Sequence, residues 1–108
     1  MQKFLVLYRS TASAQEQMSH STPEQGKAVM DEWMAWMKKA GKALVDGGAP
    51  LGESAMLKGA AGKGYIGGYS IVQADSIAAA KKLFDSHPHF KAPGASIELL
   101  EMMSVPGM

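Results

Sequence analysis

The sequence predicts an α+β domain of the ferredoxin-like kind, in which a four-stranded antiparallel sheet carries two helices on one face. The predicted elements follow the order β-α-β-β-α-β, which is typical of that fold. Both predicted helices begin at capping residues and carry apolar side chains at three- and four-residue spacing. The 108 residues leave room for one core, so we expect a single domain over residues 1–108.

An apolar run near the N-terminus predicts the first strand. Phe4 to Tyr8 reads Phe-Leu-Val-Leu-Tyr, and its β-branched and aromatic side chains favour a strand. The run is too short for a signal peptide, and no small-residue cleavage site follows it closely. No stretch approaches the roughly 20 apolar residues that span a bilayer, so we expect no membrane partner.

The first helix has clear start and stop signals. Thr22 can cap it, Pro23 suits the first helical position, and Gln25 completes a capping box. Gly41 is a natural end, so the helix is predicted over 23–40. Its apolar stripe consists of Val29, Met30, Trp33, Trp36, Met37 and Ala40.

The middle of the chain predicts short strands separated by glycine. We expect strands at 43–46 and 65–74, a further extended piece near 54–58, and a hairpin tip at 59–64. Glycine weakens a strand, so Gly67–Gly68 predicts either a bulge or a close approach by another segment.

The second helix and the last strand complete the order of elements. Asp75 is the predicted cap, and the helix is expected to end at His87, because a residue that precedes proline avoids helical geometry. The last strand is predicted over 96–103. The stripe of this helix consists of Ile77, Ala80, Leu83 and Phe84.

Composition excludes several classes of function. The net charge is +1, from 11 basic and 10 acidic residues spread along the chain, so no basic stripe is present to bind nucleic acid. The chain has no cysteine, which excludes disulfides, thiolate nucleophiles and thiolate metal ligands. We expect a cytoplasmic protein on this basis.

The predicted strands carry apolar side chains on both faces. Alternate residues of a strand point to opposite faces, so a monomer with one solvated face should alternate apolar and polar residues. The strands instead contain the apolar series Phe4, Leu5, Val6, Leu7, Tyr8, Tyr69, Ile71, Val72, Leu99 and Leu100. We therefore expect a second copy of the chain to cover the outer face in a two-fold homodimer.

His20 and Asp46 are the candidate acid–base residues. His20 precedes the first helix, and a histidine with a near-neutral pKa can act as a general base when a carboxylate orients it. Asp46 ends a short strand and could supply that carboxylate. The alternatives are an exposed loop histidine and an ordinary Asx turn with the two glycines that follow Asp46.

The first helix also carries candidate ligand-binding residues. Its aromatic and thioether side chains could form an adaptable surface for a small, partly apolar molecule, although a stripe at this spacing also suits core packing. We expect the ligand to be lined by Trp33, Trp36, Met37, Tyr69 and Ser70.

Cofactor and metal sites find little support in the sequence. The glycine-rich stretch 62–68 matches neither a P-loop nor a dinucleotide fingerprint, so we expect no nucleotide and no other cofactor. His87 and His89 could form part of a metal site, but a third ligand is missing from the pattern. Packing at the end of the second helix is the alternative, and we expect no metal.

Several short phrases follow one another along about residues 1–103. They are the strand at 4–8, Thr22-Pro23-Glu24 before Trp33-Met34-Ala35-Trp36-Met37, Gly67 to Val72 before Ala74 to Ala80, His87-Pro88, and Ile97-Glu98-Leu99. In this order they resemble the YCII-related family, in its branch that includes DGPF-domain proteins. The Asp-Gly-Pro-Phe signature itself is absent, and residues 62–66 occupy its place.

The resemblance implies a dimeric α/β barrel, with two four-stranded sheets facing each other and a pocket in each subunit between sheet and helices. It also implies enzymes that use a histidine–aspartate pair, a role that would fall to His20 and Asp46. Two functions remain open at this point. One is a cofactor-independent acid–base enzyme for a small organic molecule, and the other is a non-catalytic dimerisation or ligand-sensing module with a vestigial pocket.

Overall fold

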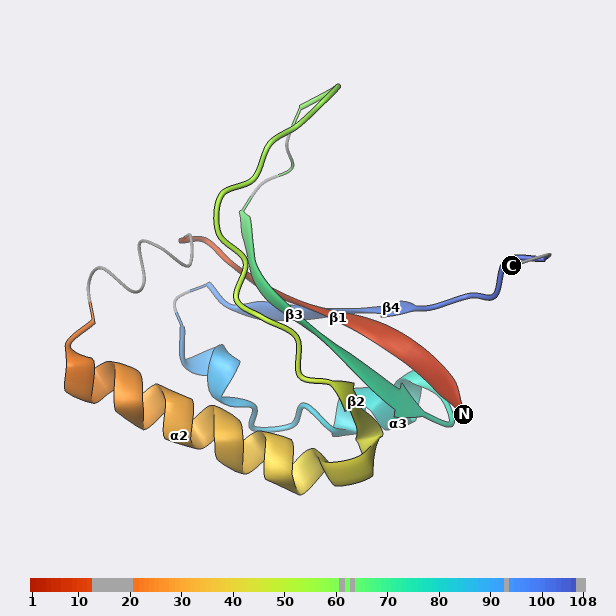
Figure 1. Cartoon of the computed structure of the whole chain (residues 1–108), viewed down its shortest axis with the longest axis horizontal. Coiled ribbons are helices and arrows are strands. Elements are labelled where there is room, and N and C mark those ends of the chain that lie inside the picture. The colour runs from red at the N-terminus through yellow and green to blue at the C-terminus, as the bar shows by residue number, and fades with distance from the viewer. Residues whose placement is uncertain (13–20, 61, 63, 93, 107–108) are drawn as a thin grey trace.

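The computed structural model describes residues 1–12, 21–60, 62, 64–92 and 94–106. A four-stranded antiparallel sheet in the order β2-β3-β1-β4 lies on one side, and the helices lie together on the other side (Figure 1). The elements are β1 (Gln2–Ser10), α2 (Pro23–Ala40), η1 (Gly41–Ala43), β2 (Leu44–Asp46), β3 (Tyr65–Ala74), α3 (Ile77–Lys82), η2 (Pro88–Lys91) and β4 (Ser96–Glu101). This arrangement confirms the predicted ferredoxin-like fold class.

β1 lies between β3 and β4, and its two faces differ in what covers them. Phe4, Val6 and Tyr8 are buried against the helices, whereas Leu5 and Leu7 point to the opposite face and remain partly exposed. The register pairs Leu5 with Ile71 on β3. The prediction of apolar side chains on both faces is therefore confirmed for the central strands.

α2 begins and ends where the sequence predicts. The Thr22 hydroxyl accepts a hydrogen bond from the backbone N–H of Gln25 at 3.1 Å, and the Gln25 side chain accepts one from the Thr22 N–H at 2.9 Å. This reciprocal pair satisfies amides that the first helical turn leaves unpaired. Gly41 ends the helix with a φ of 55°, a conformation that favours glycine.

Gly68 explains why β3 contains glycine in its interior. The register shifts between Tyr8 and Arg9, so that Gly67 is an extra residue opposite β1. A Cβ at Gly68 would lie 3.3 Å from the carbonyl oxygen of Ala49, in the segment that runs beside β3. Both halves of the prediction, a bulge and a close approach, are confirmed.

The extended piece expected near 54–58 is not a strand. The segment contacts the sheet through an isolated bridge between Pro50 and Gly68 and a hydrogen bond from the Leu51 N–H to the carbonyl oxygen of Gly67, and residues 51–60 form no strand and are exposed. A strand needs a neighbouring strand to pair its backbone groups, and here the chain turns away from β3 before any ladder forms.

The second helix is shorter than its apolar stripe suggests. Ser76 rather than Asp75 is its cap, because Ser76 has an extended backbone and its hydroxyl accepts a hydrogen bond from the Ala79 N–H at 3.1 Å. α3 ends at Lys82, and β4 ends at Glu101, two residues before the predicted end.

The described core lies between the sheet and the helices. The buried hydrophobic side chains are Phe4, Val6, Tyr8, Trp36, Val72, Ala74, Ala80 and Phe84.

None of the described helices is long and apolar enough to cross a membrane.

Candidate functional site

Five rings from three separate parts of the chain meet beneath α2. His87 is stacked on Tyr8, with ring centroids 5.2 Å apart, and Trp33 and Trp36 each approach His87 edge-on at 4.5 Å. Aromatic pairs at these distances attract one another beyond simple burial. The members of this group, which we call the His87 cluster, are Tyr8, Trp33, Trp36, Phe84 and His87.

His87 is neutral and has a single protonated nitrogen. Its Nδ1 accepts a hydrogen bond from the backbone N–H of His89 at 3.0 Å, so the ring proton belongs on Nε2. The residue is only 2% exposed, and Nε2 has no hydrogen-bond partner among the residues that the structure describes. Burial, reinforced by the electrostatic effect of His89, lowers the pKa of His87 to about 4.

A chain of hydroxyl groups runs from the His87 cluster to the loop after β2. The Ser70 hydroxyl donates to the carbonyl oxygen of Gly47 at 3.0 Å, which leaves its oxygen to accept from the Tyr8 hydroxyl at 3.0 Å. Burial raises the pKa of Tyr8 to about 12, although the Ser70 hydrogen bond acts in the opposite direction. Tyr8 is therefore a neutral donor at ordinary pH.

Asp46 lies at the outer end of this hydroxyl chain. Its Oδ1 accepts a hydrogen bond from the Gly48 N–H at 2.8 Å, which is an Asx turn. Gly48 has a φ of 72°, and a Cβ there would lie 1.7 Å from the carbonyl oxygen of Tyr69, so only glycine fits. The Asp46 side chain is exposed, and its proposed partner His20 lies outside the described residues.

Three of the predicted ligand-binding residues lie around one place. Trp33 and Met37 are one turn apart on α2 and are partly buried, with Trp33 against Tyr8 at 4.8 Å. Met37 lies over the loop, because a Cβ at Gly47 would be 3.4 Å from its sulfur. Ser70 lies beneath them, on the helix-covered face of β3.

The other two predicted ligand-binding residues lie elsewhere. Trp36 is buried in the core, where its indole N–H donates to the carbonyl oxygen of Leu83 at 2.7 Å. Tyr69 pairs with Leu7 on the opposite face of the sheet from Ser70. Trp36 therefore anchors α2 to the end of α3, and Tyr69 is separated from the hydroxyl chain by the sheet itself.

Tyr8 and His87 are the members of the site that the sequence did not indicate. The sequence pattern places Tyr8 on the same face as Phe4 and Val6, and a buried phenol needs a hydrogen-bond partner. The alternation of side chains along the strand was therefore enough to predict that Tyr8 is buried and that its hydroxyl has a hydrogen-bond partner. For His87 the only sequence signal was that it continues the stripe of the second helix by spacing. The structure places His87 beyond the end of α3, as the N-cap of η2.

His89 connects the ends of two neighbouring strands. His89 Nε2 lies 2.9 Å from the carbonyl oxygen of Arg9 and 3.1 Å from that of Ser96, so it donates to the paired ends of β1 and β4. In the described ranges, no three His, Asp or Glu side chains are grouped closely enough to hold a metal ion.

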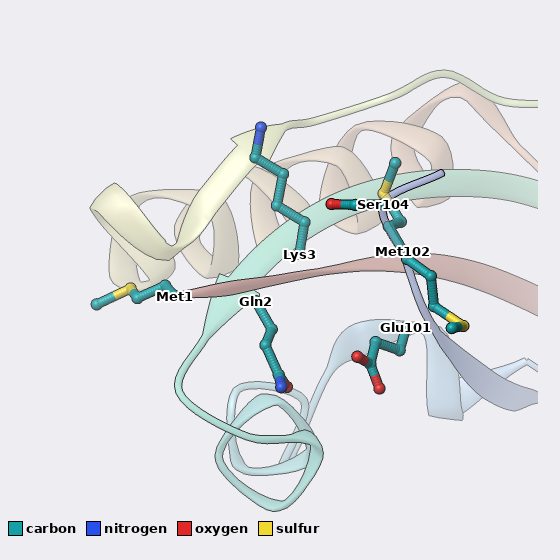
Figure 2. A pocket seen from close by; sticks show the side chains of 7 residues that line it. Met1, Gln2, Lys3, Glu101, Met102 and Ser104 are labelled. Atoms are coloured by element: carbon teal, nitrogen blue, oxygen red, sulfur yellow. The ribbon is translucent and has the colours of Figure 1, made fainter. Parts of the chain in front are cut away.

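A hollow of about 510 Å³ lies at the other end of β1 from Tyr8, away from the site beneath α2. Figure 2 shows Gln2 and Glu101 pointing to the same side there, whereas Lys3 points to the opposite side. The hollow is open, and no aromatic side chain lines it. Its lining consists of Met1, Gln2, Lys3, Glu101, Met102, Met103 and Ser104.

Comparison with known proteins places the chain in a family. No curated protein matches the chain. The family model of the YCII-related domain matches residues 3–103, which include both α-helices, every strand except the first residue of β1, and every residue of the site described above. The protein therefore belongs to the YCII-related domain family.

Proposed function

We propose that this protein binds a small, partly apolar organic molecule between α2 and the loop that follows β2, and acts on it by acid–base chemistry without a cofactor. One observation carries the proposal: a buried hydroxyl chain, Tyr8 to Ser70 to Gly47, ends beneath the partly exposed side chains of Trp33 and Met37. Small-molecule sites combine such apolar walls with a few placed polar groups.

Asp46 and His20 are the proposed acid–base pair. The Asp46 carboxylate is held by the Gly48 N–H beside the end of the hydroxyl chain, which supports its use as an orienting or proton-accepting group. His20 precedes α2 in the sequence, whose first residue is Pro23. In this proposal His20 takes a proton from the ligand, and Asp46 stabilises the imidazolium that results.

A fragment screen by two-dimensional NMR tests the binding site. We expect small aromatic carboxylic acids and phenols to shift the amide signals of Gly47 and Ser70 and the indole signal of Trp33. The Met37→Arg variant, which replaces the thioether that lies over Gly47 with a longer, charged side chain, should lose these shifts. Shifts confined to the hollow around Met102 would contradict the proposed location.

The Asx turn at Asp46 favours a second candidate function, a non-catalytic ligand-sensing or dimerisation module. The turn accounts for an aspartate at this position without any catalytic role. Asp46→Asn separates the two functions, because an asparagine oxygen can still accept from Gly48 while the carboxylate is lost. An enzyme should lose at least tenfold in turnover of its substrate, whereas a sensing module should bind its ligand unchanged.

We also propose that the protein is a homodimer through the outer face of the sheet. The apolar side chains of this outer face, which is directed away from the helices, are Leu5, Leu7, Tyr69, Ile71 and Leu100. Its polar and charged side chains, Lys3, Arg9, Gln73 and Glu98, lie around them. One copy exposes 7996 Å². A compact monomer of 11.5 kDa exposes only about 5,800 Å². The excess of about 2,200 Å², to which the exposed residues 51–60 also contribute, exceeds what one partner contributes to a standard protein–protein interface, about 800 Å².

Light scattering tests the dimer. We expect the mass of two chains at micromolar concentration, and the mass of one chain for Leu7→Glu, which places a charge at the centre of the outer face. A stable wild-type monomer would contradict the proposal.

With the dimer we propose the α/β barrel arrangement, membership of the DGPF-domain branch, and a cytoplasmic location. The absence of cysteine supports the cytoplasmic location.

A further inference from the structure

Residues 51–60, which we call the arm, leave the sheet after the bridge between Pro50 and Gly68. Figure 1 shows the arm (yellow-green) rising on the side of the sheet that faces away from α2 and α3. Every residue of the arm is exposed, including Leu57 at 100% and Met56 at 58%. The arm therefore stands on the same side as the outer face and carries apolar side chains that touch little of their own chain.

A single copy is more extended than a compact chain of its length. The radius of gyration is 14.9 Å. A compact chain of 108 residues has a radius of about 13 Å. A fully exposed leucine at the end of a projecting segment gains nothing from the hydrophobic effect unless another surface covers it.

We propose that the arm of each protomer packs against the partner protomer and contributes Met56 and Leu57 to the dimer interface. This inference rests on the outer-face dimer proposed above. A second copy placed on the outer face by a two-fold axis stands beside the arm, because the arm rises on that side of the sheet (Figure 1). The symmetry then places the partner's arm equivalently.

The arm begins beside the strand that carries part of the outer face. The arm joins the sheet at β3, where the Leu51 N–H donates to the carbonyl oxygen of Gly67 at 2.9 Å. Tyr69 and Ile71 of the outer face lie on the same strand, directly after this contact. A partner that covers Tyr69 and Ile71 is therefore next to the base of the arm, which favours a second copy as the occupant.

Single-cysteine crosslinking tests the placement of the arm, since the chain has no native cysteine. Lys58→Cys leaves Met56 and Leu57 intact and is labelled with benzophenone-maleimide. Dimers mixed from ¹⁴N and ¹⁵N chains are then irradiated and analysed by mass spectrometry. We expect crosslinked peptide pairs with one light and one heavy chain. Same-isotope products alone, in a sample that light scattering shows to be dimeric, would overturn the arm contact and leave the sheet dimer standing.

Matched variants measure what the arm contributes. We expect Met56→Ser with Leu57→Ser to weaken the dimer dissociation constant at least tenfold. The control is Met34→Ser with Ile77→Ser, which removes side chains of 57% and 50% exposure from the helices and should change the constant less than twofold. Equal constants for the arm variant and the wild type would contradict the inference. A wild-type monomer would instead contradict the dimer on which it rests.

Discussion

The two faces of the sheet are built from the same strands and differ in what covers them. Phe4, Val6 and Tyr8 are buried beneath the helices, whereas Leu5 and Leu7, which alternate with them, remain partly exposed in a single copy. Apolar character alone therefore does not tell which face forms the core. The covering layer decides it, and the following four predictions probe that difference.

The largest expected effect comes from removing a side chain of the helix-covered face. Phe4→Ala should lower the free energy of unfolding by about 3–5 kcal/mol, because Phe4 is fully buried and leaves a cavity. Leu5→Ala, its neighbour on the outer face, should cost less than about 1 kcal/mol in dilute, dissociated protein. Urea unfolding at low protein concentration measures both. Equal losses would show that the two faces do not differ in this way.

The second-largest expected effect is a dependence of the free energy of unfolding on pH. It arises from His87, which is buried on the helix-covered side of the sheet. Unfolded His87 binds a proton below about pH 6.5, whereas the folded protein keeps His87 neutral down to its pKa of about 4. The unfolded state therefore gains protons first as the pH falls, and the free energy of unfolding decreases between pH 6.5 and 4. The loss approaches roughly 3 kcal/mol at the lower end.

Histidine NMR titration checks this prediction residue by residue. The Cε1 proton of His87 should titrate with a depressed pKa, and the sign of the stability change follows from that value. A His87 pKa of 6 or above in the folded protein would contradict the burial argument. Urea unfolding at pH 4.5 and 7 gives an independent measure of the same linkage.

Two tyrosines on opposite faces offer a matched comparison of smaller size. Tyr8→Phe removes the hydroxyl that donates to Ser70 and should cost about 1 kcal/mol of unfolding free energy. Tyr69→Phe should cost close to nothing, because the Tyr69 hydroxyl has no hydrogen-bond partner in the part of the chain that the structure describes. Thermal unfolding of both variants decides the point, and a larger loss for Tyr69→Phe would reverse the comparison.

The smallest effect is expected at the ion pair between β1 and β4. Arg9 contacts Glu98 at 3.3 Å with both side chains partly exposed, so water screens their attraction. Glu98→Gln should lower the free energy of unfolding by less than about 0.5 kcal/mol, and 0.5 M salt should remove the difference. A loss above 1 kcal/mol that survives in salt would mean that this edge is shielded from solvent.

The parts of the fold that were predicted correctly depend on short-range signals. The capping box at Thr22 and Gln25, together with Gly41, determines the bounds of α2, because all these contacts lie within a few residues. β3 also matched its predicted bounds, 65–74. The expected strand near 54–58 was wrong, since strand formation requires a partner and local composition does not reveal whether one is adjacent.

The candidate site was predicted in part. Trp33, Met37 and Ser70 were expected to line one ligand and lie around one place, whereas Tyr69 lies on the opposite face and Trp36 in the core. Helical spacing identified the two residues of α2. No spacing rule brings residue 8 to residue 87, because that contact depends on how α3 and the segment after it pack against β1.

Local sequence was sufficient for the order of strands and helices, for the caps of α2, and for the apolar character of both sheet faces. These features depend on periodicity and on hydrogen bonds between near neighbours. Tertiary structure alone decided that His87 is buried with an unpaired Nε2, and that Tyr8 reaches Gly47 through Ser70. It also decided that the arm rises beside the outer face. Those features depend on contacts between distant segments, and their free energies are set by burial that no single segment contains.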